Sequence, residues 1–248
     1  MAPKPLIIDS NVQIGTGESW FQPRKPADYK LEDVLPRATE AGIDRLCVMA
    51  PFNLWYKERN KEVARLCEKH PETLIGFAVH SPQRETGKLR AMLTEEVRSM
   101  GLKAVKSDGH PTREFLDPVA ELEIPVIYYP AGEGSLYENY YMMATAYPSV
   151  NFIIPHLASY ASGDWTLHFA CADLLRRFPN VYAETSSVIY HKYLAVAVGE
   201  LPAEKFIFGS FAPDLDPRVE MYCVKLLNLP EPEKAKILGG NMQRLLGL

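Results

Sequence analysis

Eight short apolar segments recur along the chain, each followed by a stretch with helical spacing, and this alternation limits the fold more than any other feature. The segments are rich in β-branched residues, and several are apolar throughout, which is typical of parallel strands buried on both faces. They are Pro5–Val12, Arg45–Ala50, Leu74–His80, Leu102–Ser107, Ile124–Tyr129, Asn151–Leu157, Val181–Ser187 and Lys205–Phe211. The pattern predicts an α/β protein.

Helical patterns fill the intervals between these segments. Two of them, Leu31–Ala41 and Thr86–Met100, stop at a glycine, a common residue just past a helix. The others are Asn60–Lys69, Phe115–Leu122, Leu136–Ala146, Leu167–Phe178 and Tyr190–Leu201, with Val219–Leu227, Glu233–Leu238 and the tail Asn241–Leu246 at the end.

Eight strands that each precede a helix predict a (β/α)8 TIM barrel, a single domain over residues 1–248. A doubly wound open sheet is the structural alternative, and the count of eight strands and the length of 248 residues favour the barrel. No glycine-rich nucleotide motif supports a nucleotide-binding sheet.

Chemistry in such a barrel lies on the loops at the carboxyl ends of the strands. The catalytic candidates there are Lys106, Tyr129 and His156. His156 could act as a general acid or base, Tyr129 could donate to a developing oxyanion, and Lys106 could hold a carboxylate or phosphate. The alternatives are an inert, hydrogen-bonded His156 and a Lys106 buried in an ion pair with Asp108 or Glu184.

Further residues at the same end are expected to bind substrate. Asn11 and Gln13 offer paired amides suited to a carboxylate or carbonyl, and Ser186 offers a hydroxyl. A long loop, Thr16–Lys30, carries aromatic and basic residues that could roof a pocket or simply pack on the rim. The expected substrate-binding set is Asn11, Gln13, Trp20, Arg24, Ser186, Phe211 and Asp214.

Composition excludes several classes of function. A net charge of -4 and a sequence pI of about 5.9 argue against nucleic acid as a partner, because nucleic-acid binding usually calls for a basic surface. No apolar run approaches the ~20 residues that cross a bilayer, and the N-terminus lacks a signal-like apolar region, so a cytoplasmic location is expected. The 4 cysteines are widely spaced, which argues against disulfides or a zinc knuckle.

The whole chain resembles the amidohydrolase-related family of TIM-barrel metallohydrolases and decarboxylases. Asp9 and Gly15 frame the first strand as in that family, and further short motifs follow in the family's order. These are Gly101-Leu102-Lys103-Ala104-Val105-Lys106 at the fourth strand, Pro155-His156-Leu157 at the sixth, Phe208-Gly209-Ser210 at the eighth and Gly240-Asn241 before the closing helix.

The resemblance implies a metal pocket in which most ligands are replaced. The family's two first-strand histidines fall at Asn11 and Gln13, its fifth-strand histidine at Tyr129 and its eighth-strand aspartate at Phe211, while His156 keeps its place. Amides are poor zinc ligands and a phenyl ring binds no metal. We therefore expect no metal and no other cofactor. The alternative is a site rebuilt from strand-end residues such as His80, Asp108, Glu184, His191, Asp214 and Asp216.

The expected function is a metal-independent hydrolase or lyase that uses acid–base catalysis on a small anionic carboxylate or lactone. The family that the chain resembles includes lactone hydrolases that work without metal. The alternative is an inactive barrel that binds a metabolite or a partner protein, which Phe211 favours because it stands where the family has its catalytic carboxylate. An open cavity over His156 would favour the enzyme, and a cavity filled by Phe211 and the loop Thr16–Lys30 would favour the binder. A small molecule is the expected partner, and a homo-oligomer is left open.

Overall fold

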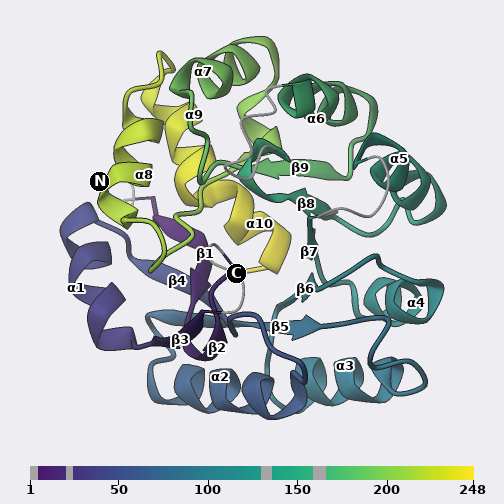
Figure 1. Cartoon of the computed structure of the whole chain (residues 1–248). Helices are drawn as coiled ribbons and strands as arrows, with labels where there is room; N and C mark the ends of the chain where they lie inside the picture. Colours follow the sequence, from purple (N-terminus) through teal and green to yellow (C-terminus); the bar gives the residue numbers. More distant parts are fainter. Residues whose placement is uncertain (1–4, 21–24, 130–135, 159–165) are drawn as a thin grey trace.

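Eight parallel strands lie at the centre of the computed structural model, with helices around them (Figure 1). The structure describes residues 5–20, 25–129, 136–158 and 166–248. Along the sheet the strands are β1 Ile8–Gln13, β4 Arg45–Met49, β5 Leu74–His80, β6 Ala104–Ser107, β7 Val126–Tyr128, β8 Phe152–Ile154, β9 Val181–Glu184 and β10 Phe206–Ile207. Each strand pairs in parallel with the next.

The sheet closes on itself where β10 meets β1. The Ser10 N–H donates to the Phe208 carbonyl at 3.0 Å, and the Gln13 N–H donates to the Ala212 carbonyl at 2.8 Å. An open doubly wound sheet would leave its two outer strands apart, so the predicted (β/α)8 TIM barrel is confirmed and the alternative is wrong.

Helices connect the strands along the outside of the barrel. They are α1 Leu31–Ala41, α2 Lys57–Lys69, α3 Leu89–Arg98, α4 Arg113–Leu122, α5 Leu136–Ala146, α6 Thr166–Arg177, α7 His191–Glu200 and α8 Pro217–Lys225, followed by α9 Glu231–Ala235 and α10 Asn241–Leu246. None of the helices in these described ranges is long and apolar enough to cross a membrane.

Local chemistry explains where several helices begin and end. α1 stops at Gly42, which takes the left-handed conformation at φ 83°. α3 begins later than predicted because the Thr86 hydroxyl bonds back to the Pro82 carbonyl within the preceding loop. α8 begins earlier than predicted because Asp216 accepts the Arg218 N–H and caps the first turn.

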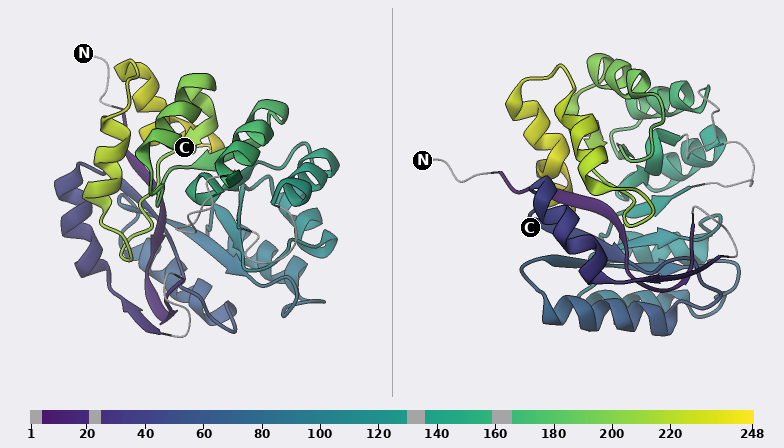
Figure 2. Two further views of the ribbon diagram at one scale, coloured as in Figure 1. Left: turned by 45° about the horizontal axis from the view of Figure 1, so that its top comes forward. Right: turned by 60° about the vertical axis from the view of Figure 1, so that its left-hand side comes forward.

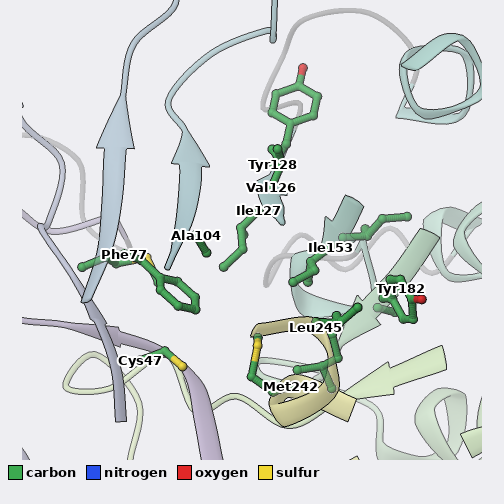
Figure 3. Close-up of a cluster of buried hydrophobic side chains, with 14 of the residues drawn as sticks. Cys47, Phe77, Ala104, Val126, Ile127, Tyr128, Ile153, Tyr182, Met242 and Leu245 are labelled. Carbon is green, nitrogen blue, oxygen red and sulfur yellow. The ribbon is translucent and has the colours of Figure 1, made fainter. Parts of the chain in front are cut away.

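The barrel interior is filled by apolar side chains from the strands and from α10. Figure 3 shows Phe77, Ile127 and Ile153 facing Met242 and Leu245 of that helix. Phe77, Ile153 and Met242 are fully buried. β1 begins near the end of the barrel where the C-terminus lies and runs toward the opposite end, which carries the hairpin of β2 and β3 (right view of Figure 2). Apolar side chains and α10 fill one end of the barrel. The polar side chains lie at the other end, where the strands have their carboxyl ends.

The predicted loop Thr16–Lys30 is partly a hairpin, which corrects that expectation. β2 Gly15–Glu18 pairs antiparallel with β3 Pro26–Tyr29. The Glu18 N–H also donates to the Phe52 carbonyl at 2.8 Å, which fastens the hairpin to the loop after β4. Strands this short, with glycines and a proline, lack the apolar alternation that reveals a strand in a sequence.

Several barrel strands end earlier than predicted, and the sixth and the eighth show why. The sixth was expected to reach Leu157, but β8 stops at Ile154 and His156, Leu157 and Ala158 turn into the left-handed region at φ 60°, 46° and 68°. The eighth was expected to reach Phe211, but β10 stops at Ile207. In both places backbone N–H groups bond to buried side chains instead of to a neighbouring strand.

Candidate active site

A buried carboxylate, Glu184, is the centre of the hydrogen bonds at the carboxyl end of the barrel. Its Oε1 accepts the Ser186 N–H at 2.6 Å, and its Oε2 accepts the Ser186 hydroxyl at 2.9 Å. Oε2 also accepts the His156 N–H at 3.2 Å and the Asn11 amide at 3.3 Å. Burial raises the pKa of Glu184, and these donors oppose the rise. The carboxylate thereby joins β1 and β9 to the turn that follows β8.

Gly209 provides the space that Glu184 occupies. A methyl group at this position would lie 2.3 Å from Glu184 Oε1 and 2.7 Å from its carboxyl carbon. Both contacts are far inside van der Waals distance, so any side chain at residue 209 would displace the carboxylate. The family-like Phe208-Gly209-Ser210 segment thus has a local physical reason.

His156 is buried and held in one orientation. Its Nδ1 lies 2.9 Å from the Ser186 hydroxyl oxygen. Because the Ser186 proton is donated to Glu184, the Nδ1–H of His156 donates to Ser186, and Nε2 is the ring's acceptor. Burial, and then the charge of Lys106, lower the pKa of His156 to about 3. The ring is therefore neutral at pH 7 and is set up as a base rather than an acid.

Lys106 is a buried cation between aromatic rings. Its Nζ lies 4.2 Å from the centre of the Trp20 ring and 5.8 Å from that of Phe211, and the residue is 7% exposed. It forms no hydrogen bond or ion pair within the described chain. Burial lowers the pKa of Lys106 to about 8, although nearby carboxylates oppose this. The alternative of a buried ion pair with Asp108 or Glu184 is therefore wrong.

Phe211 stands between these two groups. It is 1% exposed and lies at φ 57°. The Phe211 ring meets the His156 ring edge-on, with 4.8 Å between their centres. The centre of the Tyr129 ring lies 6.3 Å from the centre of the His156 ring. The mouth of the barrel, at the carboxyl ends of the strands, is therefore crossed by a row of four side chains in the order Lys106, Phe211, His156 and Tyr129.

Asp214 fastens the β2–β3 hairpin to the barrel. It accepts the Tyr29 hydroxyl at 2.6 Å, the Ser19 hydroxyl at 3.2 Å and the Gln13 amide at 3.5 Å. Burial, together with the bond to Asp214, raises the pKa of Tyr29 to about 12. Because Trp20 directly follows Ser19, this anchorage also places the indole over Lys106. Asp214 therefore holds the hairpin in place, and its predicted role in binding substrate stays a prediction.

The two amides of β1 direct their nitrogens toward carboxylates and leave their oxygens without a partner. The Asn11 nitrogen donates to Glu184 and the Gln13 nitrogen to Asp214, while Asn11 Oδ1 and Gln13 Oε1 are buried and unbonded. Such oxygens suit a hydrogen-bond donor. These oxygens would accept from a donor group, and the predicted role of Asn11 and Gln13 in binding substrate stays a prediction.

Asp9 lies beneath these amides. Its Oδ1 accepts the Ser210 N–H at 2.8 Å and the Asn11 N–H at 3.1 Å, while Oδ2 is buried without a hydrogen bond. Burial raises the pKa of Asp9 to about 7. Asp9 and Glu184 are the residues of the site that sequence reasoning left out of the predicted set, and a carboxylate inside an apolar strand run is the signal that points to both.

The candidates for a rebuilt metal site are dispersed. His80 lies outside the mouth, bonded through Nδ1 to Glu85 at 2.8 Å and through Nε2 to Glu96 at 2.6 Å. Asp108 is occupied by the Tyr56 hydroxyl at 2.8 Å and by Arg84. His191 bonds to the Cys223 carbonyl, and Asp216 caps α8.

The donor set does not fit a divalent metal of the family type. In the ranges that the structure describes, no three His, Cys, Asp or Glu side chains are placed to hold one. The atoms left to a metal at the family's positions would be His156 Nε2 and the amide oxygens of Asn11 and Gln13, while Phe211 offers no lone pair. Catalytic zinc usually takes three protein ligands of imidazole, thiolate or carboxylate type.

The structure brings most of the predicted site residues together. His156, Ser186 and Asn11 share the Glu184 carboxylate, while Lys106, Trp20 and Phe211 form an adjoining group. Arg24 lies outside the described residues. A separate hollow of about 250 Å³ lies at the opposite end of the barrel, lined by residues that include Arg45, Lys103 and Leu248.

Comparison with known proteins agrees with this architecture. A family model described as Amidohydrolase matches residues 15–248. No curated protein matches the chain. A 5-carboxyvanillate decarboxylase from Sphingomonas paucimobilis has 13% sequence identity and a TM-score of 0.77, over 99% of this chain and 100% of that one.

Two further solved structures have the same fold. A dihydroxybenzoic acid decarboxylase from Polaromonas sp. JS666, with bound manganese and 2-nitroresorcinol, has 16% identity and a TM-score of 0.77, over 99% of this chain and 98% of that one. An uncharacterised TIM-barrel protein from Bordetella bronchiseptica has 17% identity and a TM-score of 0.73, over 97% of this chain and 98% of that one.

Proposed function

The chain belongs to the amidohydrolase family, and from this premise we propose that it is a hydrolase or lyase acting on a small anionic carboxylate at the carboxyl end of the barrel. We further propose that it works by acid–base catalysis without a bound metal. The observation that carries the proposal is the pairing of Lys106, a buried cation, with His156, a neutral imidazole, across the ring of Phe211.

Lys106 gives the mouth its affinity for an anion. A buried charge without a bonded counter-ion is unfavourable, and a bound carboxylate would supply one. The rings of Trp20 and Phe211 exclude water on two sides of the ammonium, which strengthens its attraction for a ligand.

His156 is the proposed base. Its pKa is lowered partly by the charge of Lys106, so an anion bound at Lys106 raises it again and makes the base stronger when substrate is present. In a lactone opening, Nε2 would take the proton of the attacking water. In a decarboxylation, the same nitrogen would first take a proton from a hydroxyl group of the substrate and then deliver it to the carbon that loses CO2. The Tyr129 hydroxyl is the proposed donor to the developing oxyanion.

We place decarboxylation first among these reactions. Its support is that solved relatives with this fold include decarboxylases of aromatic carboxylates. The unbonded oxygens of Asn11 and Gln13 also suit a substrate or intermediate that carries hydroxyl groups.

A second candidate is a barrel that binds a ligand without converting it. Phe211 favours this alternative because its ring, 1% exposed, fills space between Lys106 and His156. The same anion would bind, but His156 would have no proton to move.

The test starts with purified protein dialysed against a chelator and checked by elemental analysis. A panel of small carboxylates and lactones is screened by thermal shift, then by release of CO2 or acid. Wild type should turn over a member of the panel, His156→Gln should lose at least about 100-fold, and His191→Gln, whose ring bonds only the Cys223 carbonyl among the described residues, should not. Turnover that requires one equivalent of manganese or zinc would overturn metal independence, and binding with no turnover would favour the second candidate.

A further inference from the structure

Lys106 has the surroundings of an amine nucleophile as well as those of an anion-binding cation. We propose that Lys106 forms an imine with the carbonyl group of a 3-oxo carboxylate, and that this imine accepts the electron pair left behind when CO2 departs. The inference rests on the proposed function, because it assigns the substrate class and the chemistry of the same site.

The enclosure of the amine is the first observation. The Lys106 side chain projects from β6, a buried strand, and its Nζ has the Trp20 ring 4.2 Å away and the Phe211 ring 5.8 Å away. Burial between aromatic rings favours the uncharged amine over the ammonium. A pKa of about 8 leaves roughly one-tenth of Lys106 as amine at pH 7, about 300-fold more than an ordinary lysine.

The second observation is that the surrounding carboxylates are occupied. Each has hydrogen-bond donors of its own, and none bonds Nζ. The donors are Tyr56 and Arg84 for Asp108, Ser186 and Asn11 for Glu184, and Tyr29 and Ser19 for Asp214. A lysine whose task was only to carry charge would be expected to have a bonded partner when buried.

Imine formation balances in atoms and charge. The amine nitrogen attacks the carbonyl carbon, a C–N bond forms, and the carbonyl oxygen becomes a hydroxyl. The C–O bond then breaks and the oxygen leaves as water. From ammonium and ketone to protonated imine and water, no proton is gained or lost, and His156 is placed to hold the proton in transit. The intermediate hydroxyl and N–H are donors of the kind that Asn11 Oδ1 and Gln13 Oε1 lack.

Loss of CO2 follows from the protonated imine. The bond to the carboxylate carbon breaks, its electron pair moves toward the positively charged nitrogen, and a neutral enamine remains. The enamine carbon takes one proton, which comes from solvent, and the protonated imine forms again. Water then adds to the imine, releases the ketone and restores Lys106.

The experiment traps the imine on the native chain. Wild-type protein is incubated with acetoacetate and then with sodium borohydride, which reduces an imine to a stable secondary amine. Peptide mass analysis should find Lys106 modified, and an isopropyl group on its nitrogen would show that CO2 left before trapping. Lys103, which is exposed and lies three residues before Lys106 in the sequence, is the internal control. Lys106 should be labelled about 100-fold more than Lys103.

Two variants separate this inference from the proposed function. Lys106→Arg keeps the positive charge but cannot form an imine, and Lys103→Arg leaves Lys106 intact. The expected result is no adduct and no acetoacetate turnover in Lys106→Arg, with both retained in Lys103→Arg. Absence of a Lys106 adduct in wild type overturns the imine. If Lys106→Arg then still binds and converts a carboxylate, the proposed function stands without it.

Discussion

The buried imidazole of His80 should make the stability of the protein depend on pH in a specific way. His80 is fully buried between the carboxylates of Glu85 and Glu96. Burial lowers the pKa of His80, but the hydrogen bonds to Glu85 and Glu96 outweigh that effect and raise it to about 9. Asn60 completes the cluster by donating to Glu96 at 2.9 Å.

The size of the effect follows from the two pKa values. The pKa of His80 is 6.5 when unfolded and about 9 when folded, and a difference of about 2.5 corresponds to about 3 kcal/mol. Between these two pKa values, the folded protein binds one more proton at His80 than the unfolded protein does. The stabilisation is therefore complete below the unfolded pKa of 6.5 and is lost as pH rises through about 9.

The measurement compares wild type with His80→Gln by urea unfolding between about pH 6 and about pH 9.5. Folding also shifts the pKa values of Lys106, Asp9 and Glu220, so the pH dependence of wild type alone does not isolate His80. The difference in free energy of unfolding between the two proteins does. That difference should shrink by about 3 kcal/mol across the range. A difference independent of pH would refute the reasoning, as would an NMR titration of the His80 ring with a pKa near 6.5.

Three other predictions concern the mouth. Gly209→Ala should displace Glu184 and lower the free energy of unfolding by about 3 kcal/mol, whereas unchanged stability would contradict the close contact. Lys106→Met should raise the free energy of unfolding by up to about 3 kcal/mol below pH 8, with the gain vanishing as pH rises toward the unfolded pKa of 10.5, and should abolish carboxylate binding in thermal-shift assays. Tyr29→Phe should lower the stability measured in urea by about 1 kcal/mol by removing the bond to Asp214, and a stabilised variant would refute that anchorage.

The sequence predicts the barrel well because buried parallel strands leave a direct pattern. Runs such as Leu74–His80 are apolar on both faces, and β5 has those bounds. Strand ends are set by partners that are distant in the sequence. His156 leaves its strand because its N–H meets a carboxylate 28 residues away, and no local pattern contains that contact.

The same limit applies to the chemistry of the site. The candidates at the strand ends were foreseeable because a barrel gathers them at one end. Their partners were not, since Asn11 and Glu184 bond across 173 residues. Asp108 stands two residues from Lys106 but accepts a hydrogen bond from Tyr56, 52 residues away, and forms none with Lys106.

The closing seam of the barrel has a consequence for motion. β10 has 2 residues, and the backbone bonds from Ser10 to Phe208 and from Gln13 to Ala212 join it and the segment after it to β1. A seam this short is where local opening should begin, well before global unfolding. Asn11 stands on β1 at that seam and bonds to Glu184, so each opening would pull on the carboxylate that orients His156. The amide protons of Ser10 and Gln13 should therefore exchange with solvent at a rate that reports how often the active site loses its alignment.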